Sequence, residues 1–368
     1  MSRNLVVLFS LSLACGPAAA TPDAGADVSV PDAGSDPGVS LADRVRAGHW
    51  TRVEGAPTVA RGKQDDIFWL SPSHAFLASG PLGAVYETTD GGGAWTPVFN
   101  STTAYFRSVL FLDAMHGFVG NIGPGLSPSI SDPNVLYRTV DGGETWTAVT
   151  EITGDAPSGL CNFTAVSETE LYGVGRANGP SHLLHSTDAG ATWTSIDLSA
   201  RLLMAIDAHF VSPTEGIVAG MGLTNRCTLL RTTDAGANWT SVFESGTAGT
   251  LCWKLDFPST RVGYAAVQGT TVGPGTVART RDGGATWEEL PLTSSFYPAI
   301  GVGFLTEEIG WVVSEDAALP TYRTFDGGET WEVEPDLVGP INRFRVIDAD
   351  TVSAVGGTVW QLDVPAGG

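Results

Sequence analysis

The chain has 368 residues and a formal net charge of −21, with 46 glycines, 11 tryptophans and only two lysines, Lys63 and Lys254. Such an acidic chain repels a phosphate backbone and an anionic bilayer, so we expect no nucleic-acid partner and no flat contact with a membrane. Many glycines and few lysines favour short strands and tight turns over long amphipathic helices.

Residues 1–15 are predicted to be an export signal, because Arg3 precedes an apolar run that is too short to span a bilayer. The run ends in Ser-Leu-Ala-Cys, which resembles a bacterial lipobox, and this resemblance implies that Cys15 becomes lipidated. The serine departs from the leucine that the lipobox prefers. Signal cleavage after Ala20 is the alternative, and it would remove Cys15.

Residues 16–43 consist mainly of Pro, Ala, Gly, Asp and Ser, a composition that cannot bury a core. We therefore predict a disordered tether for this segment. Its aspartates lack the dense ligand spacing of a calcium loop, so no metal site is predicted there. Residues 44–368 are predicted to form a single repeat domain.

A short motif recurs six times in that domain, and each copy has Thr or Ser, then Asp, Gly and Trp at one spacing. The six Asp and Trp pairs are Asp90 and Trp95, Asp141 and Trp146, Asp188 and Trp193, Asp234 and Trp239, Asp282 and Trp287, and Asp326 and Trp331. Successive aspartates are about 44 to 51 residues apart, a period typical of repeat architectures. One turn signal per period fits one blade of a β-propeller.

Each period is predicted to contain four short strands. In the second period these are residues 106–112, 118–120, 135–138 and 146–149, so the motif is the hairpin turn between the third and fourth strands. Glycine permits the positive φ of such a turn, and the aspartate can accept hydrogen bonds from turn amides and from the Thr or Ser hydroxyl. The tryptophan then supplies a large apolar side chain that packs against the sheet.

The two ends of the domain predict how the ring closes. Residues 341–362 supply three strands of a further blade, but no motif follows them. Residues 49–53, with Trp50, resemble the strands that begin at a motif tryptophan. We therefore predict an all-β fold, a seven-bladed β-propeller in which the N-terminal strand completes the last blade and removes the free sheet edges.

The motifs resemble Asp-box (BNR-like) repeats, which are found in sialidases, some xyloglucan-cleaving glycosidases and sortilin-type receptors. Four of the predicted second strands also begin with Gly and an apolar or aromatic residue, as in Gly117-Phe118 and Gly263-Tyr264. Residues 49–362 therefore most resemble the photosystem II assembly and stability factor family. The resemblance implies that the box Asp and Trp residues are structural and lie opposite the functional face. A photosystem role need not follow, because relatives of this family occur in organisms without photosynthesis.

The sequence assigns no catalytic residue, metal or cofactor. The sialidase family's N-terminal Arg-Ile-Pro signature is absent, and the arginines that precede several boxes recur with the repeat, at Arg138, Arg231, Arg279 and Arg323. Zinc spacings, phosphate-binding loops and nucleophile elbows are also absent from the sequence. The two carboxylates of a glycosidase leave no local motif. A sialidase-like glycoside hydrolase or a carbohydrate-binding propeller therefore stays as the alternative to a non-catalytic protein.

A binding site is predicted on the face formed by the loops between blades and between second and third strands, here called the loop face. Polar and apolar residues alternate along the predicted innermost strands, which predicts a polar ring at the mouth of the central channel. The candidate binding residues are Asp66, Arg107, Asp207, His209, Trp253, Lys254, Asp256, Arg343 and Arg345. This composition fits a site for a polar ligand or a partner's side chains, and it equally fits an internal network of ion pairs.

Three cysteines remain when Cys15 is set aside. Cys227 begins a third strand and Cys252 begins the next blade, so both map to the loop face. In an exported protein this placement favours a disulfide between them and leaves Cys161 unpaired.

Taken together, these features predict an exported, lipid-anchored and monomeric propeller in the bacterial cell envelope, facing the periplasm or the cell surface. We expect it to act as a non-catalytic binding or assembly scaffold. Its expected partner is an envelope protein or complex, with a polysaccharide as the alternative.

Overall fold

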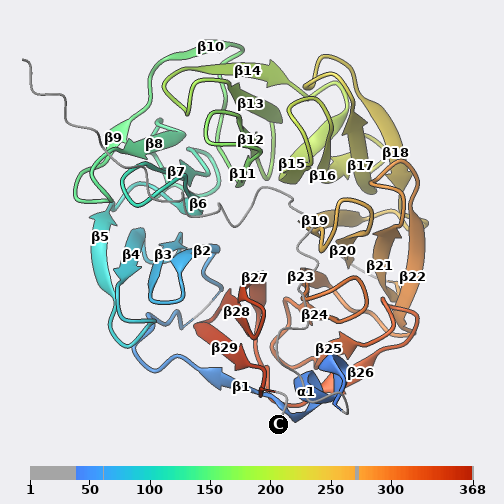
Figure 1. Ribbon diagram of the computed structural model, residues 1–368. Coiled ribbons are helices and arrows are strands. Elements are labelled where there is room, and N and C mark those ends of the chain that lie inside the picture. Colours follow the sequence, from blue (N-terminus) through green and yellow to red (C-terminus); the bar gives the residue numbers. More distant parts are fainter. Residues whose placement is uncertain (1–38, 61, 270–272, 367–368) are drawn as a thin grey trace, which may run out of the picture.

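The computed structural model describes residues 39–60, 62–269 and 273–366. The predicted signal, Cys15 and the tether up to residue 38 lie outside the described residues. Seven sheets are arranged around a central axis, and one edge strand of each sheet lies next to the axis (Figure 1). The fold is therefore the seven-bladed β-propeller that the sequence predicts. No helix in the described part of the chain has the length and apolarity to cross a membrane.

The first three blades follow one another around the axis. Blade one contains β2 (Asp66–Ser71), β3 (His74–Ser79), β4 (Ala84–Thr88) and β5 (Thr96–Asn100). Blade two contains β6 (Phe106–Phe111), β7 (Gly117–Asn121), β8 (Leu136–Thr139) and β9 (Thr147–Ala148). Blade three contains β11 (Asn162–Ala165), β12 (Leu171–Gly175), β13 (His182–Ser186) and β14 (Trp193–Asp197), with β10 (Ile152–Gly154) added in parallel outside β14.

The next three blades have four antiparallel strands each. Blade four contains β15 (Leu202–Phe210), β16 (Gly216–Gly222), β17 (Cys227–Thr232) and β18 (Thr240–Glu244). Blade five contains β19 (Thr250–Asp256), β20 (Gly263–Gly269), β21 (Gly275–Thr280) and β22 (Glu288–Thr293). Blade six contains β23 (Ala299–Phe304), β24 (Gly310–Ser314), β25 (Thr321–Thr324) and β26 (Glu332–Glu334).

Blade seven closes the ring with both ends of the chain. It contains β27 (Ile341–Asp348), β28 (Thr351–Gly356), β29 (Val359–Asp363) and β1 (His49–Arg52). The strand β1 pairs antiparallel with β29, and Trp50 lies opposite Leu362 (Figure 1). This pairing is the closure expected from the sequence, and it hydrogen-bonds the edge that an incomplete last blade would expose.

A short helix, α1 (Leu41–Ala47), precedes β1 and begins inside the segment predicted to be tether. The side chain of its N-cap residue Ser40 accepts a hydrogen bond from the Asp43 amide, and Val45 is buried against blades six and seven. Residues 41–43, the end of the segment predicted to be tether, are therefore helical. Burial of one apolar side chain in the neighbouring core orders this end of the segment.

The Gly-aromatic pattern has a packing cause at the first turn of four blades. In these blades a glycine begins the second strand, and a phenylalanine lies at or just after the end of the first strand. A Cβ built on the glycine would come closer than 3.0 Å to a ring carbon of that phenylalanine. The glycines are Gly117, Gly216, Gly263 and Gly310. The ring placed over this glycine reaches the preceding blade. Phe304, for example, stacks on Tyr264 with ring centroids 3.5 Å apart, and Phe210 stacks on Tyr172 at 3.6 Å.

The boxes form the turns between third and fourth strands, and their polar groups satisfy one another. In all six, the Thr or Ser hydroxyl donates to the aspartate over 2.7–2.9 Å and accepts the amide of a turn glycine. In the second box, Asp141 accepts the amide of Thr145 at 2.9 Å and its hydroxyl at 2.6 Å. These hydrogen bonds from Thr145 hold the pKa of Asp141 below its usual value.

Candidate functional site

The innermost strands do not keep a simple alternation near the axis. The register of β6 against β7 shifts between Phe106 and Ser108, and similar irregularities occur in β15, β19, β23 and β27. A β-bulge of this kind turns an additional side chain away from its regular direction. Side chains of two consecutive residues in an innermost strand can therefore both point to the axis, and they form two layers there. Regular alternation of side chains along a strand predicts only one of these layers.

The outer layer lies at the loop-face mouth of the channel and is called here the mouth layer; it consists of Lys63, Asp65, Arg107, Trp253 and Asn342. The Asp65 carboxylate accepts a short hydrogen bond from the Arg107 guanidinium. It also forms an ion pair with Lys63, whose Nζ lies 3.3 Å from Oδ1. The Trp253 ring, from blade five, lies 4.9 Å from the Arg107 guanidinium and 5.0 Å from the Lys63 ammonium. Its indole N–H donates to Asn342 of blade seven at 2.8 Å. Trp253 thus spans the mouth of the channel.

Beneath it lies the central layer, which consists of Asp66, Asn162, Asp207, Lys254 and Arg343. Arg343, from blade seven, crosses the axis and donates to both oxygens of Asp207 in blade four at 3.1 and 3.2 Å. The same guanidinium donates to Asn162 at 3.1 Å and lies 3.5 Å from Asp66. All five side chains are buried.

Several predicted binding residues instead join neighbouring blades. Asp66, Asp207 and Asp256 accept the backbone amides of Val109, Leu255 and Phe304 in the next blade. Arg345 donates to the Ile67 carbonyl at 3.1 Å and to Asp66 at 3.1 Å. Both faces of an innermost propeller strand look at a neighbouring blade, so its polar side chains reach that blade's backbone. For Asp66, Asp207, Arg343 and Arg345 the contacts are those of an internal network.

His209 does not lie at the mouth. Its ring stacks on Phe257 with centroids 4.3 Å apart, beside a small crevice between blades four and five that also contains Glu215 and Arg231. Glu215 lies in the turn between β15 and β16, on the same face as the boxes. The expectation that His209 lines the loop-face mouth is therefore wrong, because the innermost strand runs toward the opposite face as it reaches this residue.

The two lysines experience strong desolvation. Burial, followed by the positive charge of Arg343, lowers the pKa of Lys254 to about 7. Burial and the charge of Arg107 lower the pKa of Lys63 to about 8, although Asp65 opposes this shift. Within the described residues, no group of three His, Cys, Asp or Glu side chains is arranged to hold a metal ion.

An apolar surface borders the mouth layer on the side of blades two to five and is called here the mouth patch. Its partly exposed members come from blades two to five and pack on a buried apolar cluster; they are Tyr105, Ile130, Ala177, Met204 and Trp253. Next to Met204, Leu203 is 45% exposed where β15 begins, and Leu223 is 57% exposed just after β16. Exposed apolar side chains with an aromatic and a methionine are typical of recognition surfaces.

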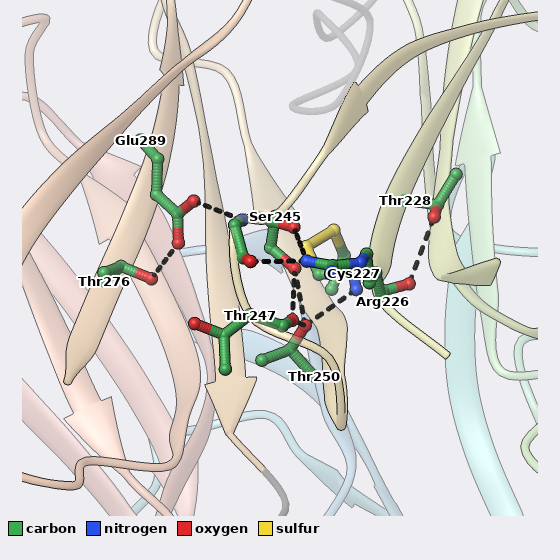
Figure 2. Close-up of a disulfide and its surroundings, with 10 residues drawn as sticks. Arg226, Cys227, Thr228, Ser245, Thr247, Thr250, Thr276 and Glu289 are labelled. Atoms are coloured by element: carbon green, nitrogen blue, oxygen red, sulfur yellow. Dashed lines mark hydrogen bonds between the residues drawn. A yellow bond between two sulfur atoms is a disulfide. The ribbon is translucent and has the colours of Figure 1, made fainter. Parts of the chain in front are cut away.

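A disulfide anchors the blade-five side of the mouth patch. Cys227 and Cys252, the pair favoured by the sequence, are bonded and buried, and join β17 to β19 one residue before Trp253 (Figure 2). Cys161 is a free, buried thiol.

Hydrogen bonds brace the loop beside this disulfide (Figure 2). Thr250 accepts the Cys227 amide at 2.9 Å and bonds to the Ser245 hydroxyl at 2.6 Å, while Arg226 donates to the Ser245 carbonyl at 2.8 Å. The backbone that leads into Trp253 is therefore fixed from two blades, which presents the mouth patch without a large ordering cost on binding.

Three residues of the mouth layer were not predicted from the sequence: Lys63, Asp65 and Asn342. Asp65 and Lys63 precede β2, and Asn342 sits at the register shift of β27. Their only signal in the sequence is their position one to three residues before a predicted ring residue. In a strand that alternates regularly, the residue before a ring residue points into the packing between blades. The bulge in β27 turns Asn342 to the channel instead.

The fold and the mouth geometry define a seven-bladed Asp-box propeller with an aromatic-capped channel. Residues 109–254 match the family model described as "Photosynthesis system II assembly factor YCF48". This confirms the resemblance that the boxes and second strands indicate. A comparison with curated proteins gives no match.

Similar solved structures support the same fold. A structure of YCF48 bound to a D1 peptide is similar with a TM-score of 0.63 and 17% identity, covering 86% of this chain and 97% of that one. YCF48 from Cyanidioschyzon merolae gives the same score and identity, with 86% and 99% covered. The GH74 xyloglucanase from Xanthomonas campestris has a TM-score of 0.62 and 14% identity, covering 85% of this chain and 53% of that one. At these identities the likeness shows the fold alone.

Proposed function

We propose that this protein is a non-catalytic scaffold that binds a protein partner through the mouth patch. The observation that carries the proposal is the combination of Trp253, Tyr105 and Met204 at the surface with the cations Lys63 and Arg107 directly beneath. Aromatic residues, methionine and arginine are enriched where proteins bind one another. The braced loops and the disulfide supply a rigid frame for this surface.

The carboxylates of the channel support a non-catalytic role. A glycosidase uses two carboxyl groups on either side of a cleft, one of them free to donate a proton. Asp207 is buried and ion-paired with Arg343, and Asp66 is buried between Arg343 and Arg345. Burial alone would raise the pKa of Asp207, but the positive charges of Arg343 and Lys254 outweigh burial and hold this pKa below its usual value, so this carboxylate does not serve as a general acid at neutral pH.

The similar structures supply one argument for each class of partner. One of them is YCF48 bound to a D1 peptide, which supports a peptide or protein as the partner here. The similar xyloglucanase makes a polysaccharide the alternative partner.

We further propose that the protein is exported and lipid-anchored at Cys15, so that its partner is a protein of the bacterial envelope. The apolar segment after Arg3 and its lipobox-like end support this proposal. Labelling cells with a palmitate analogue tests it. Label that resists acid and is lost in Cys15→Ala supports the anchor, whereas equal labelling of both proteins contradicts it.

Site-specific photo-crosslinking tests the mouth patch. We would place a photoreactive phenylalanine analogue at Leu223 on the loop face and, as the matched control, at Val140 in a box turn, which is 54% exposed on the opposite face. A single protein captured from Leu223 but not from Val140, and lost when Met204→Asp is added, supports the proposal. Equal capture at both positions contradicts it. Retention of polysaccharide at Leu223 without a protein would establish the carbohydrate alternative.

A further inference from the structure

The buried charges of the channel do not balance. Seven charged side chains from the mouth and central layers are buried. Four are cations and three are carboxylates; they are Lys63, Arg107, Lys254 and Arg343 against Asp65, Asp66 and Asp207. The set thus holds one more positive charge than negative, inside a protein whose overall charge is −21.

Each buried carboxylate already has a cationic partner. Asp65 pairs with Arg107 and Lys63, and Asp207 pairs with Arg343. Asp66 lies between Arg343 and Arg345, at 3.5 and 3.1 Å. The buried cation left over is Lys254.

Lys254 has no ion-pair partner in the described part of the chain. Its side chain is 1% exposed, and no carboxylate oxygen of the described residues lies within 4.0 Å of its ammonium nitrogen. An ammonium group that is buried without a partner is strongly destabilising. Something must therefore compensate this charge in the folded protein.

Further hydrogen-bond donors nearby lack partners. The Nε and Nη2 groups of Arg107 are buried and form no hydrogen bond within the described residues, whereas the Nε group of Arg343 faces Asp66 at 3.5 Å. Lys254 follows Trp253 in the chain; the Trp253 ring lies 4.9 Å from the Arg107 guanidinium, and its indole N–H donates to Asn342, the neighbour of Arg343. Buried donors normally have a partner, and exceptions point to an ion or a water molecule. Three cations from blades two, five and seven thus converge with spare donors.

From this arrangement we propose that the channel binds one small monovalent inorganic anion, of the chloride class, between Lys254, Arg107 and Arg343. The excess charge is a single unit, so a monovalent ion neutralises it and a divalent ion would overcompensate. Binding requires no contribution from the mouth patch, and the inference does not depend on the proposed partner. Its physical role is to stabilise the junction of blades that face one another across the axis.

Proton linkage makes the proposal measurable. An anion beside Lys254 favours its charged form, so it raises a pKa that burial has lowered to about 7. By linkage, a chloride concentration ten times the dissociation constant raises the Lys254 midpoint by about one pH unit, if only the protonated form binds. The rival explanation is that Lys254 is neutral in the folded protein and needs no anion. In that case its titration midpoint does not depend on the anion.

The chain contains only two lysines, which gives a direct experiment on the whole protein. Lysine labelled with carbon-13 at Cε yields two side-chain NMR signals, and Lys63→Arg assigns them. The Lys254 signal would be titrated between pH 5 and 10, a range of about five units around the lysine midpoints, first in sodium chloride and then in sodium gluconate of equal ionic strength. Gluconate is a bulky monovalent anion and controls for general screening.

We expect the Lys254 midpoint to rise with chloride and the Lys63 midpoint to stay constant. Equal midpoints in the two salts overturn the proposal, and so do equal shifts of both lysines. A second readout is the melting temperature at pH 6.5, about half a unit below the lowered Lys254 midpoint. It should increase with chloride for the wild type and for Lys63→Met, but not for Lys254→Met. Retained chloride dependence in Lys254→Met would place the anion elsewhere.

Discussion

The carboxylate of Asp141 accepts the Thr139 hydroxyl, the Thr145 amide and the Thr145 hydroxyl, all within one box. Asp141→Ala removes these bonds and leaves the turn amide unsatisfied. We expect a loss of about 1–2 kcal/mol in the free energy of unfolding, measured by urea denaturation. Capture of a partner at Leu223 should not change.

Glu144→Ala is the matched control, because Glu144 is an exposed residue of the same turn. It should alter the free energy of unfolding by less than about 0.5 kcal/mol. Selective loss of partner capture in Asp141→Ala, at unchanged stability, would give this box a direct role in binding.

The lowered pKa of Lys254 makes stability depend on pH in a defined direction. Unfolded lysine titrates near 10.5 and folded Lys254 near 7, so the unfolded state binds more protons between these values. Stability therefore rises with pH above about 7, by at most about 1.4 kcal/mol per pH unit for one proton. Urea unfolding at pH 7 and pH 9 in chloride-free buffer measures this rise.

Lys254→Met should remove most of the rise, and Lys63→Met a smaller part, because the pKa of Lys63 is lowered only to about 8. A wild-type protein that loses stability between pH 7 and pH 9 would contradict the burial of an uncompensated lysine.

At the scale of single residues, the sequence identifies several channel residues by position but not by role. Asp207 and Arg343 belong to different predicted blades, and only the structure shows that Arg343 crosses the axis to Asp207. The sequence places Trp253 near the loop face, whereas its bond to Asn342 and its contact with Lys63 require three blades to be placed together. Such contacts leave no local pattern.

At the scale of strands, substitution of the glycine that begins a second strand tests how tightly this strand packs against the phenylalanine of the first strand. A Cβ on Gly263 would overlap ring carbons of Phe257. Gly263→Ala should therefore lower the free energy of unfolding by about 1–3 kcal/mol, because a filled core resists added volume. Thermal or urea denaturation followed by circular dichroism measures it.

Gly357→Ala is the control for this substitution, because nothing lies within 4 Å of a Cβ built on Gly357. It should be neutral or slightly stabilising. If the two variants lost stability equally, backbone freedom rather than ring packing would explain the glycine in these strands.

Strand positions were predictable because the boxes fix the third and fourth strands of six blades and the Gly-aromatic pairs fix four of the second strands. The bulges in the innermost strands were not. The strands β6, β15 and β27 each contain a bulge, but no residue type is shared at the three shifts. The sequence therefore carries no local signal for them. The offset in β27 accounts for the missed Asn342, whereas Lys63 and Asp65 were missed because they precede β2.

The closure of the ring predicts how the whole molecule unfolds. Deletion of residues 44–54 removes β1, including Trp50, which is buried against Trp311 and Phe344. Loss of one buried tryptophan alone costs about 3–5 kcal/mol. We expect the deletion variant to melt far below the wild type in one cooperative transition, followed by circular dichroism.

Thr51→Ala in the same strand is the control, since Thr51 is exposed and should change the melting temperature little. An unchanged melting curve for the deletion would show that blade seven is stable with three strands, and that the N-terminal strand does not close the ring.

The sequence alone determined the number of blades, the place of the boxes and the closure by the N-terminal strand, and it favoured the pairing of Cys227 with Cys252 that the structure shows. These features follow from turn chemistry and from a period, both of which are written in residues close together along the chain. The tertiary structure alone decided which side chains meet at the axis, that His209 faces the other side, and that Lys254 is buried without an ion-pair partner among the described residues. Seven strands bring residues from distant repeats within bonding distance there, and their register and bulges, not their order in the sequence, set those contacts.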